Sequence, residues 1–346
     1  MAGTDTAQRA YIGSFTSAGG AGITVASLDA ESGALRPRHS TDAVANPSYL
    51  ALSAGGDILY AVCETDDGAA AALSVADPAR PPALLADPVS VRGAGPTHLA
   101  LAAGHLLTAN YVSGSVTALP VRDGGVLGEP TALFQDEGGG PHPERQRGPH
   151  AHAVRPDPSG RWLLTVDLGT DAVRSYGLPG LRPHGAVRMR PGSGPRHLAF
   201  HPRGDRVYVI NELEPTITIC RWDAADGTLE PLGETPVLPD GFAGECFPSE
   251  VVVSGDGRFV WAAARGADTV TTFALDASGD RLDPVATTPC GGSWPRDLVL
   301  GPSGRHLYAA NERSGDITWF TVDDATGVPG RAGSIEAPAA SCVVFG

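Results

Sequence analysis

A unit of about fifty residues recurs along the chain, and this repeat restricts the fold more than any other feature. One copy lies between Gly194 and Asp223. It reads as three short strands, Leu198 to Phe200, Val207 to Ile210 and Thr216 to Trp222, with polar turns between them. Turn residues alternating with β-branched and aromatic runs are typical of antiparallel hairpins. No long stretch has the 3.6-residue apolar period of a helix, so an all-β fold is predicted.

The proline that opens each unit serves as its register mark. Successive marks are 49, 53, 46, 53 and 47 residues apart, and Ala340 takes the seventh equivalent place 45 residues after the last proline. A period of this length with several strands in each unit is typical of β-propeller blades. The six proline marks are Pro47, Pro96, Pro149, Pro195, Pro248 and Pro295.

The seventh unit is divided between the two ends of the chain. Its first strand is ASCVVF (Ala340 to Phe345), and its other strands are AYIGSF, GITVASLD and LRPRHS near the N-terminus. Pairing these segments closes the ring and leaves no free sheet edge. The sequence thus predicts a seven-bladed β-propeller of four-stranded antiparallel blades, a single domain over 10–346. Residues 1–9 have no signal-peptide pattern and are expected to form a flexible tail.

Charge and cysteine content limit the partners and the chemistry. The net charge is −14, which disfavours nucleic acid or an anionic membrane as a partner. All 25 basic residues are arginine, and the absence of lysine excludes Schiff-base chemistry and a Walker-type phosphate loop. The five cysteines are widely spaced without a CxxC pair, and no apolar run is long enough to span a membrane. A cytoplasmic protein, by default a monomer, is expected.

Two repeat positions carry unusual polar residues. The third residue after each mark is aliphatic except at His152, which predicts a functional role for this histidine. Side chains alternate along a strand, so the first and third positions are expected to share one face. The first position after each mark is polar in all seven units: Ser48, Thr97, His150, Arg196, Ser249, Arg296 and Ser341.

The other unusual place in the repeat is the end of the second strand of each unit. Polar residues found there include Asn110, Glu212, Arg265 and Glu312. In antiparallel neighbours the start of one strand lies beside the end of the other. We therefore expect one mouth of the central channel to gather the following side chains: His150, His152, Arg196, Glu212, Arg265, Arg296 and Glu312.

Several segments together resemble the seven-bladed propeller lactonases, a family that includes propeller-type 6-phosphogluconolactonase and the carboxymuconate-lactonizing cyclase. The resemblance covers Tyr11 to Phe345. Its segments are NPSYLALS, ILYAVCE, ANYVSGSV, PERQRGPHAH, DLGTDAV, GPRHLAFHP, VINEL, RGADTV, PRDLVL and SCVVF.

The resemblance implies a catalytic set, and further residues are expected to bind substrate. The implied catalytic residues are His150 or His152, Arg196, Glu212 and Arg265. Arg145 and Gln146, which resemble a family element, are expected to bind substrate together with Asn110 and Arg296. Such relatives usually carry Asn where this chain has Cys63 and Ala264, a departure that bears on the orientation of Arg265 and on substrate choice.

The residues of this set suit lactone chemistry. Opening a lactone with water needs a base, which a histidine provides, and donors for the oxyanion, which arginine provides. Glu212 can orient an arginine or protonate the leaving oxygen. A hydrolase of a small anionic lactone is expected, resembling 6-phosphogluconolactonase in carbohydrate metabolism.

Two alternative functions remain open at this stage. The same groups suit the reverse chemistry, in which a cyclase closes a lactone from a carboxylated metabolite such as a muconate. A non-catalytic propeller that serves as a binding platform is the third hypothesis. His142, His150 and His152 also raise the question of a metal, but spacing gives them no carboxylate partner, so a reaction without metal or other cofactor is expected.

Overall fold

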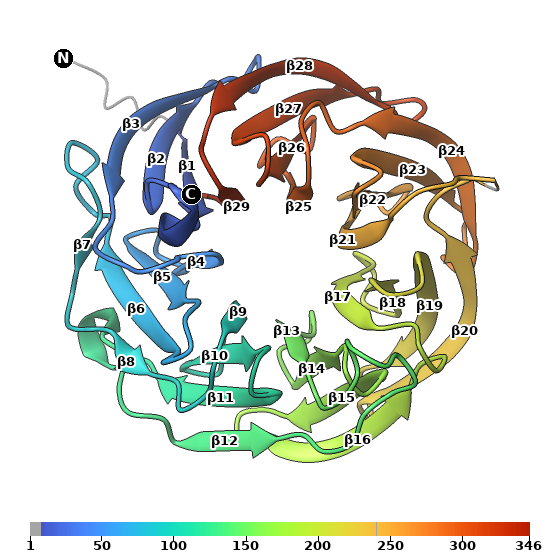
Figure 1. The fold of residues 1–346 in the computed structure, drawn as a ribbon, viewed down its shortest axis with the longest axis horizontal. Helices are drawn as coiled ribbons and strands as arrows, with labels where there is room; N and C mark the ends of the chain where they lie inside the picture. Colours follow the sequence, from blue (N-terminus) through green and yellow to red (C-terminus); the bar gives the residue numbers. More distant parts are fainter. Residues whose placement is uncertain (1–7, 240) are drawn as a thin grey trace.

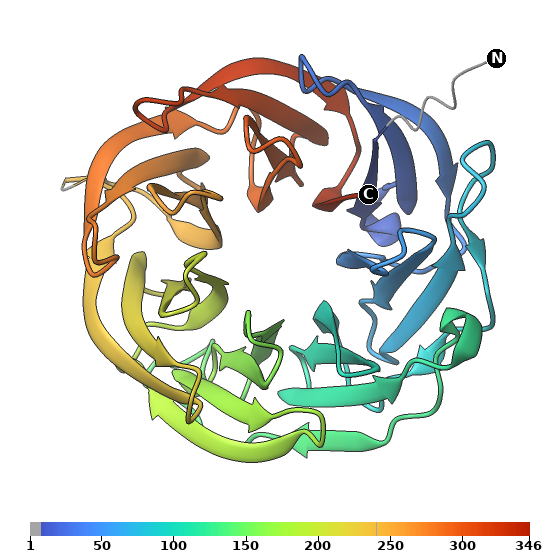
Figure 2. The ribbon, with the colours of Figure 1, turned by 180° about the vertical axis from the view of Figure 1, so that it is seen from behind.

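The computed structural model describes residues 8–239 and 241–346, which form a ring of seven antiparallel β-sheets (Figure 1). This confirms the predicted seven-bladed propeller. Within these ranges the helical segments are two single 3-10 turns, η1 (Thr16–Ala18) and η2 (Asp123–Gly125). In each blade the first strand lies at the centre of the ring and the last at its rim, as the view from behind also shows (Figure 2).

The strand order is the same around the ring. The first blade has the order β29-β1-β2-β3, and the following blades begin with β4, β9, β13, β17, β21 and β25. The strands of the first three blades are β1 (Arg9–Ser14), β2 (Ile23–Leu28), β3 (Leu35–Thr41), β4 (Leu50–Leu52), β5 (Ile58–Cys63), β6 (Ala69–Ser74), β7 (Ala83–Leu84), β8 (Val89–Ser90), β9 (Pro96–Ala102), β10 (His105–Asn110), β11 (Ser115–Pro120) and β12 (Ala132–Gln135).

The remaining blades repeat this arrangement. Those of the fourth and fifth blades are β13 (Ala151–Pro156), β14 (Trp162–Asp167), β15 (Ala172–Gly177), β16 (Arg182–Arg188), β17 (Pro195–Phe200), β18 (Arg206–Asn211), β19 (Thr216–Asp223) and β20 (Thr228–Pro236). The last nine are β21 (Phe247–Val253), β22 (Phe259–Arg265), β23 (Thr269–Leu275), β24 (Leu282–Pro289), β25 (Pro295–Leu300), β26 (His306–Asn311), β27 (Asp316–Val322), β28 (Pro329–Glu336) and β29 (Ala340–Phe345).

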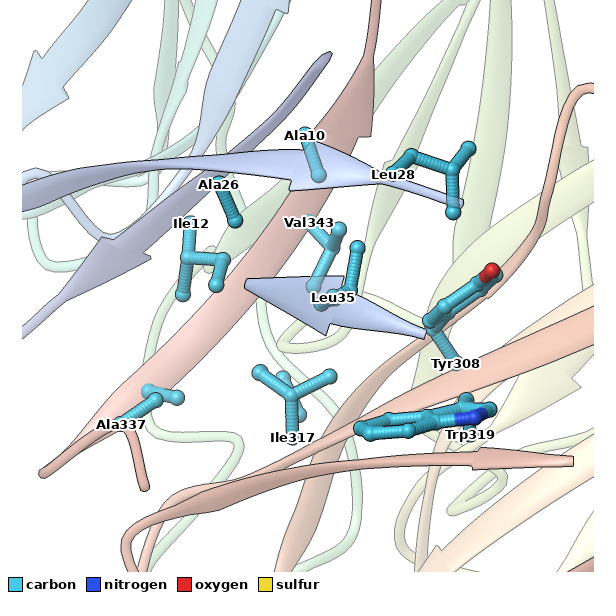
Figure 3. Packing of buried hydrophobic residues seen from close by; sticks show 12 residues of the cluster. Ala10, Ile12, Ala26, Leu28, Leu35, Tyr308, Ile317, Trp319, Ala337 and Val343 are labelled. Atoms are coloured by element: carbon cyan, nitrogen blue, oxygen red, sulfur yellow. The ribbon is translucent and has the colours of Figure 1, made fainter. Parts of the chain in front are cut away.

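The ring closes where the two ends of the chain meet. Strand β1 pairs with β29 in antiparallel register, with Ile12 opposite Val343. The repeat unit that is divided between the two ends of the chain thus forms the first blade, as predicted. Figure 3 shows the apolar cluster at this seam, in which Ile12 and Val343 pack with Tyr308 and Trp319 of the neighbouring blade. Strand β1 begins at Arg9, so that residue belongs to the sheet, and residues 1–7 of the expected tail lie outside the described residues.

Clusters of buried apolar side chains fill the seams between neighbouring blades. A repeated hydrogen bond crosses several of these seams. The hydroxyl of Tyr308 donates to the Gly33 carbonyl at 2.8 Å, and the hydroxyl of Tyr208 donates to the Gly279 carbonyl at 3.0 Å. Both glycines have positive φ, which other residues seldom adopt, so the turn conformation itself requires glycine there. At these two seams, neighbouring blades are thus held together by apolar packing and by a buried hydrogen bond.

The second blade departs from four strands. Its outer edge is two short strands, β7 and β8, which both pair with β6. Pro81, Pro82 and Pro88 lie in or beside this edge, and proline has no backbone N–H to donate to a sheet. The edge strand is therefore interrupted, at a position far from the channel.

Register in the fourth blade differs from the prediction. Ala151 pairs with Asp167 as Pro195 pairs with Asn211, so Ala151, not Pro149, is the equivalent mark. His152 therefore corresponds to Arg196, and the prediction that it interrupts an aliphatic position was wrong. That aliphatic position belongs to Val154, which is buried in an interblade cluster.

In other blades a β-bulge explains why the first and third positions after the mark do not share one face, as simple alternation of side chains had predicted. Register shifts between Pro195 and His197 in β17, and the same shift occurs in β21 and β25. The extra residue turns the first and second positions after the mark toward the channel. The third position, such as Leu198, packs between blades instead.

Candidate active site

Glu212 lies at the centre of a group of three arginines at one mouth of the channel. Its Oε2 is 3.1 Å from Nε of Arg196 and 2.6 Å from Nη2 of Arg265. Its Oε1 is 2.5 Å from Nη2 of Arg145. These side chains come from three separate parts of the chain, so the ring brings together the charged residues that the sequence predicted at one mouth.

The charges in this group do not balance. Burial by itself would raise the pKa of Glu212, but Arg265, Arg196 and Arg145 lower it to about 2, so the carboxylate is ionised at neutral pH. Burial lowers the pKa of Arg196 to about 9, and the nearby Arg265 acts in the same direction. Three guanidinium groups therefore face one carboxylate, which leaves an excess of two positive charges for an anionic ligand.

The two channel arginines are held by backbone carbonyl groups, Arg196 by one in the neighbouring blade and Arg265 by one in its own blade. Arg196 follows the mark of β17, where the bulge directs it to the channel, and its Nη1 donates to the Ser249 carbonyl. Arg265 ends β22, and its Nε donates to the Phe247 carbonyl at 3.2 Å. Both guanidinium groups are thus fixed before any ligand binds, which reduces the entropic cost of binding.

Arg145 is carried to the mouth by the loop that enters the fourth blade, and Gln146 fixes that loop. The side chain of Gln146 is buried and donates to the Leu168 carbonyl and to Oδ1 of Asp171, both at 2.8 Å. Its Oε1 accepts from the His142 backbone N–H at 3.0 Å. Because both of its N–H groups are used inside the protein, Gln146 does not fit the substrate-binding role expected for it, and it positions Arg145 instead.

His150 stands beside Tyr111 at the same mouth. Its Nδ1 is 2.8 Å from the Tyr111 carbonyl, which can only accept, so Nδ1 carries a proton, and in the neutral imidazole the lone pair is on Nε2. The two rings stack with centroids 4.5 Å apart. The Tyr111 hydroxyl accepts from Nη2 of Arg145 at 3.1 Å, which connects His150 to the group around Glu212.

His152 lies deeper in the channel, in contact with both Tyr111 and His197. Burial lowers the pKa of His152 well below its usual range, and Arg196 acts in the same direction, so the ring is neutral. Its Nδ1 has no hydrogen-bond partner among the described residues. His150 and His152 therefore occupy different environments, one half-buried at the mouth and the other fully enclosed.

Asn110 does not fit the substrate-binding role expected for it. Its side chain is fully buried at the end of β10. Its amide nitrogen donates to Ser115 and Thr117, and its carbonyl oxygen accepts from Thr108. The residue anchors the turn between β10 and β11, and the next residue, Tyr111, reaches the mouth in its place.

Arg296 lies in a second charged group, formed by the second and seventh blades. Its Nη1 is 3.1 Å from Oε2 of Glu312, and its Nη2 is 3.8 Å from Oε1 of Glu64. The Phe15 ring lies 4.9 Å from its guanidinium carbon, and the Ser48 hydroxyl donates to Glu64. A small cavity joins this group to the first one, since Glu64 and Arg296 line it together with His152 and Arg196.

Comparison with known proteins agrees with this architecture. The model of the family described as "Lactonase, 7-bladed beta-propeller" matches residues 9–345. The chain belongs to this lactonase family. It is 32% identical to the 6-phosphogluconolactonase of Bacillus subtilis over 340 residues, which cover 97% of each protein.

Solved structures of relatives superimpose on this lactonase over nearly its whole length. A Bacteroides fragilis protein matches with a TM-score of 0.93 at 31% identity, covering 100% of this chain and 99% of that one. The periplasmic gluconolactonase of Pseudomonas aeruginosa matches with a TM-score of 0.89 at 29% identity, covering 98% and 99%. No helix within the described ranges is long and apolar enough to cross a membrane.

The deeper channel of the lactonase contains titratable residues for which the sequence predicted no active-site role. Nδ1 of His197 is 2.5 Å from Oε2 of Glu250. Burial raises the pKa of Glu250 to about 7 and that of Asp297 to about 7, with Glu250 adding to the latter. These three residues share the second position after the mark with Tyr49 and His98, and this repeated occurrence of titratable or aromatic residues was a signal available in the sequence.

A larger cavity, of about 980 Å³, opens at the opposite end of the channel. It is lined mainly by the far ends of the first strands, including Leu52, Phe200 and Leu300. Arg145, Glu212 and Arg265 are not among its lining residues. Charge and hydrogen bonding therefore place the candidate active site at the smaller, polar mouth.

The candidate metal ligands of the sequence do not gather in one place. No group of three or more His, Cys, Asp or Glu side chains suited to a metal occurs among residues 8–239 and 241–346. Nδ1 of His142 accepts from the backbone N–H groups of Glu144 and Arg145, so it serves the loop. The expected absence of a metal requirement stays a prediction.

Proposed function

We propose that this chain hydrolyses a phosphorylated sugar-acid lactone, as the name of its Bacillus subtilis relative suggests for that protein. One observation carries the proposal. Three guanidinium groups surround the single carboxylate of Glu212, and a histidine with a free Nε2 stands beside them. Such a site attracts an anionic substrate and holds a base next to it.

Binding is the first step of the proposed reaction. Arg145, at the edge of the mouth, is the most exposed of the three arginines and meets an incoming phosphate first. Arginine binds phosphate and carboxylate through paired hydrogen bonds. Glu212 holds the guanidinium groups in place without neutralising them all, so their attraction for the substrate persists in the free protein.

His150 is the proposed general base. Donation from its Nδ1 to the Tyr111 carbonyl leaves Nε2 free to take a proton from water. That water attacks the lactone carbonyl carbon, and the oxygen of the carbonyl becomes an oxyanion. His152 is less suited to this step because a proton on its buried ring would face the charge of Arg196.

The buried guanidinium groups stabilise the oxyanion in this scheme. Arg196 and Arg265 lie in a water-poor environment, where hydrogen bonds to developing charge are strongest. When the tetrahedral intermediate collapses, the bond between the carbonyl carbon and the ring oxygen breaks. Protonated His150 returns its proton to that oxygen, and the new carboxylic acid releases a proton to solvent.

The test is the rate of hydrolysis of 6-phosphogluconolactone compared with its spontaneous rate. His150→Gln should lower kcat by about 10²–10⁴-fold, the usual contribution of a general base. His184→Gln is the matched control, because His184 is exposed on the outer strand β16. A wild-type protein that does not exceed the spontaneous rate would contradict the proposal.

The same experiment distinguishes the alternatives. Loss of muconate ultraviolet absorbance without lactone hydrolysis would assign the cyclase activity instead. Binding of metabolites that is unaffected by Arg196→Lys or Glu212→Gln, with no turnover, would support a binding platform.

We further infer that the chain acts as a monomer on a small anionic metabolite, without nucleic acid or membrane as partner. The net charge of −14 disfavours nucleic acid and anionic membranes as partners. The cytoplasm is the proposed compartment, and the five cysteines, all free thiols, suit a reducing environment. Size-exclusion chromatography tests the oligomeric state, and cell fractionation tests the compartment.

A further inference from the structure

We propose that Glu64 and Glu312 recognise hydroxyl groups of the substrate, so that the mouth holds an anion on one side and a polyhydroxylated chain on the other. The inference rests on the proposed function and concerns the same site. It assigns a specificity-determining role to the charged group that contains Arg296, which the reaction scheme leaves unused.

The two parts of the mouth carry opposite charge. Around Glu212, three guanidinium groups face one carboxylate. Around Arg296, two carboxylates face one guanidinium group. The first part therefore has an excess of two positive charges, and the second has an excess of one negative charge.

The acidic part keeps hydrogen-bond acceptors available. Glu312 uses Oε2 to accept from Arg296, while Glu64 uses Oε2 to accept from Ser48. An ionised carboxylate offers about four lone-pair directions, so each retains capacity for a ligand hydroxyl. The side chains of Arg296, Glu64 and Glu312 are 21%, 20% and 25% exposed, which is enough for a ligand to reach them.

An unpartnered buried group points to a ligand at the same place. His152 is 95% buried, and its Nδ1 has no partner among the described residues. It lines the small cavity together with Glu64, Ser48 and Arg296. A buried polar atom without a partner is costly. The cavity has a volume of about 10 Å³, room for one oxygen atom, so a single ligand hydroxyl or one ordered water in it would satisfy Nδ1.

This arrangement favours a sugar acid over an unsaturated polycarboxylate. A sugar hydroxyl can donate to Glu64 and Glu312, whereas a carboxylate on a muconate cannot donate and would be repelled by them. The separation of charge therefore favours a ligand with a run of hydroxyl groups beside an anionic group.

Calorimetric binding of two matched ligands tests the inference without turnover. 6-Phosphogluconate and 6-phosphooxyhexanoate share both anionic ends and the chain length, and only the first carries hydroxyl groups. We expect the wild-type protein to bind 6-phosphogluconate at least about 10-fold more tightly. Glu312→Gln and Glu64→Gln should each weaken that binding by about 10-fold or more, the usual effect of losing a hydrogen bond to a charged group, and change the other ligand by less than about twofold.

Glu230→Gln is the control, since Glu230 also pairs with an arginine, Arg221, at 2.6 Å but lies on the outer strand β20. Equal or absent binding of the two ligands by the wild-type protein would overturn the inference, as would equal weakening of both ligands in Glu312→Gln. Lactone hydrolysis is measured separately. A protein that prefers 6-phosphogluconate but hydrolyses no lactone refutes the proposed function and leaves hydroxyl recognition standing, whereas an active protein without the preference refutes only the inference.

Discussion

Nη2 of Arg265 lies 2.6 Å from Oε2 of Glu212, and this contact joins the fifth blade to the sixth. The two residues are 53 positions apart in sequence. Arg265 ends β22, the second strand of its blade, and Glu212 directly follows β18, the second strand of the neighbouring blade. Their meeting depends on how the blades pack around the ring. The charged centre of the candidate site is therefore a property of the assembled propeller and not of any single blade.

Arg265→Lys should lower lactone hydrolysis by about 10²–10³-fold, the effect of losing one oxyanion donor. Lysine keeps the charge but cannot contact Glu212 and the Phe247 carbonyl together, as the guanidinium does. Steady-state kinetics measures the effect. Arg221→Lys on β19 is the control, because its guanidinium pairs with Glu230 at the surface. Unchanged turnover in Arg265→Lys would rule out its oxyanion role.

Glu212→Gln should destabilise the folded protein by about 3–5 kcal/mol at neutral pH, because buried guanidinium groups lose their counter-charge. The folded-state pKa of Glu212, about 2, lies below its ordinary value of 4.5. The stability contributed by this carboxylate is therefore complete above about pH 4.5 and is lost as the pH falls toward 2. Denaturant unfolding at several pH values should show the gap between wild type and variant shrinking over that range, and a constant gap would contradict the assignment.

Glu250→Gln should flatten the dependence of stability on pH between about 4.5 and 7. Burial raises the folded-state pKa of Glu250 to about 7, so the folded protein binds more protons than the unfolded chain in this interval. Stability from this group therefore falls as the pH rises through the interval. Burial also raises the pKa of Asp297 to about 7, so Asp297 should preserve part of the pH dependence of stability in the variant. Thermal unfolding across the interval checks this, and a slope equal to that of wild type would refute it.

Gln146→Leu should raise KM for an anionic lactone more than it lowers kcat. The change leaves the Leu168 carbonyl and Oδ1 of Asp171 without their donors, so the loop that carries Arg145 is no longer fixed. Limited proteolysis should report faster cleavage within the loop. Gln135→Leu is the control, because Gln135 is exposed and contacts only carbonyl groups near the loop's start. An equal change in KM for both variants would argue against the positioning role.

Much of the fold could be predicted from the sequence because the same strand pattern recurs in each unit, so that one unit helps to interpret the others. The proline marks located six blades, and the divided unit predicted the pairing of β1 with β29. The exception was the fourth blade, where Pro149 ends the preceding loop and Ala151 begins the sheet. A two-residue difference of this kind depends on the path of a long loop, which strand patterns do not record.

The sequence predicted which charged residues meet at the site, but it did not predict the role of each polar residue near it. Glu212, Arg196 and Arg265 meet as expected, since strand ends set their positions. Asn110 and Gln146 were also predicted to bind substrate, but the side-chain amides of both form hydrogen bonds with other groups of the protein. Which partner a buried amide chooses depends on three-dimensional neighbours that no local pattern specifies.

Pairing of β1 with β29 has a consequence for how the molecule is made. Synthesis proceeds from the N-terminus, so β1 leaves the ribosome more than 300 residues before the strand that will cover its inner edge. During translation that edge is open to any other extended segment, including those of neighbouring nascent chains. The last strand to emerge is thus the one that converts a row of nascent blades into a sealed circle, and chaperones that shield β1 would be of most use before that moment.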